Sequence, residues 1–168
     1  RELYAYAVHC LFSLLYPLVF ALVIGAFFGM PIEAVAMIMP FIAVRKFSGG
    51  YHADSFGKCL CISSIVIVAA LQISKYVDNN ITFNLIYIVS SILLMIFSPI
   101  DSANKRLDNE DRKFCKKVTI LIVLVLFIIV ELLWIAGYRH YTKYIEVGVI
   151  LAELLQIVAI FKVKYSRK

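Results

Sequence analysis

The stretch Val118–Ala136, with the sequence VTILIVLVLFIIVELLWIA, decides what kind of protein this is. Its only charged residue is Glu131. A helix needs about 20 predominantly apolar residues to cross the hydrocarbon core of a bilayer. A helix that is apolar on all sides is buried or faces lipid. We therefore predict that this stretch is a transmembrane helix.

The rest of the chain repeats this pattern. Glycine, proline, asparagine or charged residues separate five further apolar runs: Leu3–Met30, Ile32–Val44, Leu60–Tyr76, Ile81–Phe97 and Tyr144–Phe161. Of the 168 residues, 62% are apolar and 17% are charged. Soluble domains typically have about 45–50% apolar and about 25% charged residues. The predicted fold class is therefore an all-α membrane protein, one integral-membrane domain over residues 1–168 with about six transmembrane helices.

The second of these helices is expected to be short. Ile32–Val44 reaches only about 20 Å at about 1.5 Å per residue, and it contains Pro40. The bilayer core is about 30 Å thick. This segment therefore either crosses with strain or ends inside the protein.

Lysine and arginine residues are distributed unequally between alternate connections. Fourteen lie at the N-terminus, in 45–58, in 99–117 and in the C-terminal tail, whereas the other side holds Lys75, Arg139 and Lys143. Cytoplasmic loops carry the excess of these residues. We therefore expect a multi-pass protein of the cell membrane with both termini and residues 45–58 in the cytoplasm. The net charge of +6 then belongs to membrane loops, and we expect a lipid bilayer and no nucleic acid as partner.

Reactive residues concentrate in one polar segment, Arg45–Cys61, with the sequence RKFSGGYHADSFGKCLC. His52 and Cys59 are a candidate general base and nucleophile, because a nearby imidazole and a helix N-terminus both activate a thiol. On one continuous helix their Cα atoms would lie about 10 Å apart, too far for a side-chain hydrogen bond. A working pair therefore needs a bend at the glycine pair 49–50 and a helix that begins near residue 54 or 55.

Spacing alone leaves other interpretations open. A cysteine in an apolar helix and a histidine near a membrane interface are common without any catalytic role. His52, Cys59 and Cys61 could also bind a metal, but a tetrahedral site needs a fourth ligand that is not evident nearby. We expect no metal and no cofactor. The four cysteines of the chain fit no disulfide framework and are expected to be reduced.

Glu33, Glu131 and Glu153 lie in or at the edge of the predicted spans. A charge at mid-bilayer costs at least about 2.5 kcal/mol, so such residues are functional candidates or buried structural contacts. We favour the structural role and expect Glu131 to be the interior group. The same carboxylates keep open a second class of function, a small membrane transporter or exporter of a peptide or another solute.

The central segment resembles a known family. Arg45, Gly49-Gly50-x-His52-Ala53 and Cys59 six residues later look like the signature of the accessory gene regulator B (AgrB) family. These are membrane peptidases that process autoinducing-peptide precursors in Gram-positive bacteria. The resemblance continues in Ser98-Pro99 after the fourth span and in Ser102-x-x-Lys105. It covers most of the chain. The family's N-terminal cytoplasmic stretch is absent before Arg1, so we expect the chain to begin downstream of the native start.

The resemblance implies a thiol protease in which His52 and Cys59 are the catalytic pair, supported by Arg45, Gly49 and Gly50. Such an enzyme cleaves the C-terminal tail from an AgrD-like quorum-sensing propeptide through a thioester on its cysteine. A substrate side chain then closes a thiolactone or lactone ring. The family is also described as homodimeric. The acidic tail of the precursor would dock on basic residues of the 99–117 connection, Lys105, Arg106, Arg112 and Lys113, although these could equally serve only as the positive-inside signal.

Overall fold

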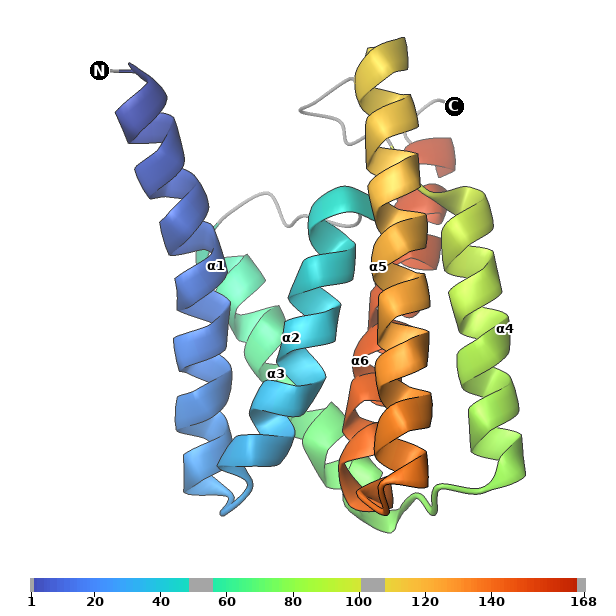
Figure 1. Ribbon diagram of the computed structural model, residues 1–168. Coiled ribbons are helices and arrows are strands. Elements are labelled where there is room, and N and C mark those ends of the chain that lie inside the picture. Colours follow the sequence, from blue (N-terminus) through green and yellow to red (C-terminus); the bar gives the residue numbers. More distant parts are fainter. Residues whose placement is uncertain (1, 49–55, 101–107, 166–168) are drawn as a thin grey trace.

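The computed structural model describes residues 2–48, 56–100 and 108–165, and within them the side chains of 15–48, 64–100 and 108–161. Every regular element in these ranges is an α-helix: α1 (Glu2–Phe27), α2 (Pro31–Ser48), α3 (Phe56–Tyr76), α4 (Ile81–Phe97), α5 (Asn109–Ile135) and α6 (Arg139–Tyr165). Successive helices alternate in direction, so α2, α4 and α6 end where α3 and α5 begin (Figure 1). The predicted all-α chain of six helices is confirmed for the described residues.

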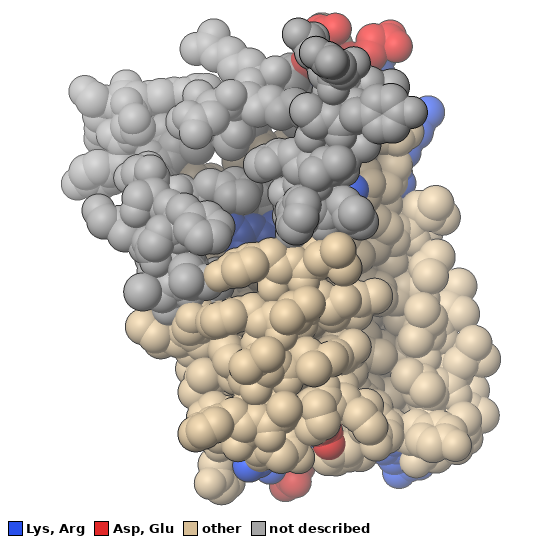
Figure 2. Space-filling view, turned by 90° about the vertical axis from the view of Figure 1, so that its left-hand side faces the viewer, with Lys and Arg blue, Asp and Glu red and all other residues tan. Residues whose placement is uncertain are grey.

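Among the described residues, two helices are long and apolar enough to cross a membrane, α5 and the Arg139–Phe161 part of α6. The outer face of α5 is strongly exposed, with Leu121, Ile128 and Leu132 between 56% and 61% exposed. Figure 2 shows a broad band without charged side chains above the lower edge of the described surface. An exposed apolar surface of this extent is typical of contact with lipid or with another protein. Together these features indicate association with a membrane.

Capping residues explain where α4 and α5 begin. Asn80 lies in the turn predicted from the sequence, and its side chain accepts a hydrogen bond from the Phe83 N–H at 2.9 Å. The Asp108 side chain accepts one from the Asn109 N–H at 2.7 Å. Because of this cap, α5 begins well before Val118, and its first turns include charged residues that the sequence suggested as part of a connection.

The second helix is longer than its predicted apolar run, Ile32–Val44, but it is still shorter than every other described helix except α4. α2 continues through Pro40 to Ser48 and has 18 residues, which corresponds to about 27 Å. Arg45 and Lys46 lie in its last turn, where positive charge is favourable because it complements the helix dipole. Pro40 packs against α6 at Gly148: a Cβ added to this glycine would lie 2.9 Å from the Pro40 Cγ. The close approach of the two helices therefore accommodates the proline.

α2 is the central helix of the bundle and packs against α1, α3, α5 and α6. One cluster of buried side chains joins α1, α2, α3 and α6, and includes Ala21, Met37, Leu71 and Tyr144. A second joins α2, α4, α5 and α6, and includes Val44, Tyr87, Val123 and Val149. Because α2 and α6 contribute to both clusters, their contact positions the end of α2, from which the segment with His52 continues.

Candidate active site

The segment that contains His52 starts next to a hydrogen bond between two distant parts of the chain. The Ile100 N–H donates to the Ser48 carbonyl oxygen at 3.0 Å. Ser48 directly precedes residues 49–55, and Ile100 directly precedes residues 101–107. This bond therefore brings together the starting points of the two segments that carry most of the predicted site residues.

A second polar contact stabilises the same end of the bundle. The Ser98 hydroxyl donates to the Thr119 hydroxyl oxygen at 3.1 Å. The Thr119 hydroxyl in turn donates to the Cys115 carbonyl oxygen at 2.9 Å. Ser98 and Thr119 are both buried, so these bonds satisfy polar groups that water cannot reach. Together with the Ser48–Ile100 bond, they connect α2, α4 and α5 close to the candidate site.

Arg45, predicted to support activity, lies on the last turn of α2 and is half-buried. Its guanidinium carbon is 5.4 Å from the centroid of the Phe41 ring, which is a cation–π distance. The contact orients the Arg45 side chain one turn before the start of the segment with His52. The supporting role of Arg45 in activity stays a prediction.

A helix boundary separates His52 from Cys59. α2 ends at Ser48 and α3 begins at Phe56, so Cys59 belongs to the first turn of α3. The start of α3 at Phe56 agrees with the expectation of a helix that begins near residue 54 or 55. His52, the glycine pair 49–50 and the Cys59 side chain lie outside the described residues. The contact between imidazole and thiol therefore stays a prediction.

Two of the four residues predicted to dock an acidic peptide tail are described. Arg112 and Lys113 are exposed at the start of α5, at the same end of the bundle as Ser48. Two acidic residues of the first turn precede them directly, so the charge of this surface is mixed. Lys105 and Arg106 lie outside the described residues.

The expectation that Glu131 is the interior carboxylate is wrong. Glu131 is exposed, whereas Glu146 and Glu153 on α6 are 0% and 2% exposed. Gln156 follows on α6 and is also buried. The polar ends of these three buried side chains have no hydrogen-bond partner among the described residues. Rotation of α5 and α6 against their neighbours decides which carboxylate faces inward, and the composition of the spans does not contain this information.

Glu146 also lies inside the predicted sixth span, Tyr144–Phe161, and was missed there. The signal that could have identified it is its distance of seven residues from Glu153. Residues seven apart lie on the same face of an α-helix, since seven residues make almost two turns. Two carboxylates with this spacing in an apolar run predict a shared polar face.

Glu33 forms an ion pair at the opposite end of the bundle. Its Oε1 atom lies 3.0 Å from the Nε2 atom of His140, which joins the start of α2 to the start of α6. No third ligand accompanies this pair: within the described residues, no group of three or more His, Cys, Asp or Glu side chains could hold a metal ion.

Comparison with known proteins adds an independent observation. A model of the accessory gene regulator B family matches residues 1–160, a range that contains all of the predicted site residues. Two proteins of Clostridium perfringens named AgrB-like, one from strain SM101 and one from strain 13, are similar to the chain. Each is 24% identical over 148 residues, which cover 83% of this chain and 69% of the relative. No solved structure gives a significant match.

Proposed function

The chain belongs to the accessory gene regulator B family, and from this premise we propose that it is a cysteine endopeptidase that matures an autoinducing peptide. Its substrate is an AgrD-like quorum-sensing propeptide. The enzyme cleaves off the C-terminal tail and promotes cyclisation of the remaining peptide to a thiolactone or lactone. His52 and Cys59 form the catalytic pair.

The observation that carries this proposal is the hydrogen bond between the Ile100 N–H and the Ser48 carbonyl oxygen. It joins the beginnings of the His52 segment and of the connection after Ser98-Pro99, the two parts of the sequence that resemble the family. α3, which carries Cys59, starts at the same end of the bundle (Figure 1). Nucleophile, base and docking surface must be within reach of one extended peptide, and this arrangement supports that requirement.

The proposed reaction has two steps. In the first, the Cys59 thiol gives its proton to the His52 imidazole and the sulfur attacks the scissile carbonyl carbon. The carbon–nitrogen bond breaks, and the tail leaves as an amine that takes the proton from the imidazolium. In the second step, a substrate thiol or hydroxyl gives its proton to His52 and attacks the thioester carbon. Closure of the ring releases the Cys59 thiolate, which recovers the proton.

Membrane topology is part of the proposal. All six helices cross the membrane, with both termini and the catalytic pair on the cytoplasmic side, and two copies form a homodimer. The excess of lysine and arginine in alternate connections supports this orientation. Cys59 would then lie where the chain enters the bilayer. Restricted access of water to the thioester would favour cyclisation over hydrolysis.

The acidic tail of the precursor is proposed to dock on the basic residues after Ile100. Arg112 and Lys113 support this, since both are exposed at the end of the bundle that carries the candidate site. The double variant Arg112→Glu/Lys113→Glu is expected to raise the KM for precursor cleavage with a smaller effect on kcat. Lys75→Glu, at the other end of the bundle, is the matched control and should leave both unchanged.

Co-expression with an AgrD-like precursor, followed by mass spectrometry, tests the catalytic assignment. The unmodified protein is expected to release the tail and the cyclic peptide, and trapped intermediates should carry an acyl group on Cys59. Cys59→Ser and His52→Ala should each leave the precursor intact. Cys61→Ser, two residues away on the same helix, is the control and should cleave normally. Cleavage by Cys59→Ala at an unchanged rate would refute the proposal.

Export of a solute is the second candidate function, and the buried carboxylates favour it. Glu146 and Glu153 face the interior of the bundle and have no hydrogen-bond partner in the part of the chain that the structure describes. If the protein is only an exporter, Glu153→Gln should block movement of the solute while Cys59→Ala should not. If it is a peptidase, Cys59→Ala should block precursor cleavage while Glu153→Gln should not.

A further inference from the structure

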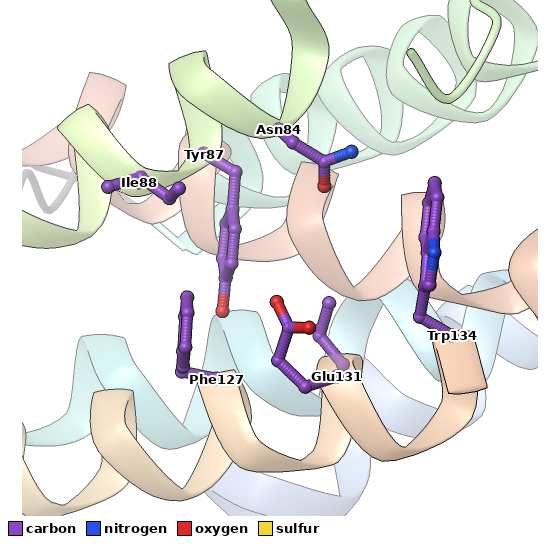
Figure 3. Close-up of a pocket in the computed structure, with 7 residues that line it drawn as sticks. Asn84, Tyr87, Ile88, Phe127, Glu131 and Trp134 are labelled. Atoms are coloured by element: carbon purple, nitrogen blue, oxygen red, sulfur yellow. The ribbon is translucent and has the colours of Figure 1, made fainter. Parts of the chain in front are cut away.

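A pocket of about 100 Å³ opens between α4 and α5, at the end of the bundle opposite the candidate active site. Its lining combines three aromatic rings with two polar side chains: Tyr87, Phe127 and Trp134 with Asn84 and Glu131 (Figure 3). None of these residues has a role in the proposed reaction. The pocket is therefore a separate site.

The polar groups that face the pocket are mainly acceptors. The Asn84 Nδ2 atom donates to the Asn79 side-chain oxygen at 3.3 Å and to the Asn80 carbonyl oxygen at 3.2 Å. The Asn84 amide oxygen instead points toward the Glu131 carboxylate (Figure 3). The Tyr87 hydroxyl also points toward this carboxylate; it is buried and has no hydrogen-bond partner among the described residues. The Glu131 carboxylate and the Asn84 amide oxygen only accept hydrogen bonds, whereas the Tyr87 hydroxyl can donate or accept, so a further donor fits between the two acceptors.

One carboxylate, Glu131, lines the pocket. No ion pair or hydrogen bond joins Glu131 to another described side chain. One cation lies next to the pocket: the Arg139 guanidinium carbon is 4.7 Å from the centroid of the Trp134 ring, which lines it. The Glu131 carboxylate is exposed, so a cation in the pocket can reach it.

The aromatic rings that line the pocket favour one kind of cation. The rings of Tyr87 and Phe127 are nearly parallel, with centroids 6.3 Å apart and an interplanar angle of 7°. Aromatic faces attract organic ammonium ions, whereas Mg²⁺ and Ca²⁺ prefer a shell of oxygen ligands. A carboxylate beside several rings therefore favours an ammonium group over a metal ion.

We propose that this pocket binds the ammonium group of a small organic cation. Glu131 is its counter-ion, the Asn84 amide oxygen accepts one of its hydrogen bonds, and the rings of Phe127 and Trp134 surround its carbon atoms. Exposed apolar residues flank the pocket on both helices, with Leu85 56% and Leu132 61% exposed. The ammonium group can therefore come from the ethanolamine head group of a lipid or from a soluble amine.

Fluorescence of the full chain gives a direct assay, because Trp134 is the only tryptophan. The protein is placed in phosphatidylglycerol nanodiscs and titrated with ethylammonium chloride, with sodium chloride as the ionic-strength control. Ethylammonium should change the emission saturably, and sodium should not. Glu131→Gln should weaken binding by about tenfold or more, which corresponds to about 1.4 kcal/mol. Glu33→Gln removes a carboxylate that lies outside the pocket. This variant should bind ethylammonium as the unmodified protein does.

A second set of nanodiscs identifies the source of the ammonium group. If a lipid head group occupies the pocket, phosphatidylethanolamine should produce the bound-state emission by itself, and added ethylammonium should have no further effect. If the ligand is a soluble amine, the ethylammonium titration should be the same in both lipids. Either result supports the proposal.

Three results would overturn it. One is a titration that does not saturate, or that is the same in Glu131→Gln as in the unmodified protein. Another is an equal response to sodium, which would indicate a metal ion or an ionic-strength effect. The third is binding seen only after Arg139→Gln, which would mean that the protein's own arginine fills the pocket.

Phe127→Leu is a second variant and tests how much the aromatic ring contributes to binding. It should weaken the binding of ethylammonium about threefold.

Discussion

Replacing Gly148 by alanine is expected to force α2 and α6 apart. A Cβ at this position would overlap the Met37 carbonyl oxygen and lie 2.9 Å from the Pro40 Cγ. Carbon atoms in good contact are about 3.5–4.0 Å apart, so the two helices would have to separate by about 1 Å. The main obstacle is a backbone atom, which cannot rotate out of the way as a side chain can.

Two opposing effects determine the magnitude. Alanine favours a helix over glycine by about 1 kcal/mol. Overpacking of an interior costs about 1–3 kcal/mol, and a clash with backbone atoms belongs at the upper end of this range. A gap of about 1 Å along the interface would also weaken the contacts of the buried residues around Gly148. We expect a net loss of about 2 kcal/mol in the free energy of unfolding, which lowers Tm by about 4–8 °C for a chain of this size.

Thermal unfolding in detergent, followed by circular dichroism, measures this loss. Val158→Ala is the matched control, because Val158 is on α6 but is 48% exposed, and its Tm should change by less than about 2 °C. Cleavage of the precursor should fall with Gly148→Ala, since α2 positions Arg45 and Ser48. A Tm equal to or above that of the unmodified protein would show that α2 and α6 are not in close contact at Gly148.

Three further substitutions test other contacts. Ser98→Ala removes the hydrogen bond to Thr119 and should lower Tm by about 2–4 °C, a loss of about 1 kcal/mol; an unchanged Tm would contradict a buried bond. Glu33→Gln breaks a partly exposed ion pair with His140 and should destabilise by less than about 1 kcal/mol, an effect that should disappear at high salt. Glu153→Leu replaces a buried carboxylate without a partner, so Tm should stay the same or rise; a loss above about 2 kcal/mol would reveal a partner for this carboxylate.

The bounds of α4 were predictable to the residue, because both of its ends carry strong local signals. α4 runs from Ile81 to Phe97, as the sequence predicts, because Asn80 caps its start and Ser98-Pro99 follows its end. Both signals act over three or four residues, so neither depends on the rest of the fold.

The length of α2, and which glutamates are buried, were not predictable from local signals. Pro40 normally disfavours a helix, yet α2 continues through it, and the proline lies close to α6 at Gly148. Glu131 and Glu153 occur in similarly apolar runs, yet one is exposed and the other is buried. The difference lies in how each helix is rotated against its neighbours, which depends on residues far away in the sequence.

The sequence by itself determined that the chain is helical and rich in apolar surface, that it resembles the AgrB family, and that His52 and Cys59 are the candidate catalytic pair. These conclusions follow from composition, charge distribution and local motifs. Only the tertiary structure decided that Ser48 meets Ile100, that Glu146 is buried, and that Glu131 lines an aromatic pocket. Each depends on contacts between helices, and the packing of α2 against α6 and of α4 against α5 sets those contacts.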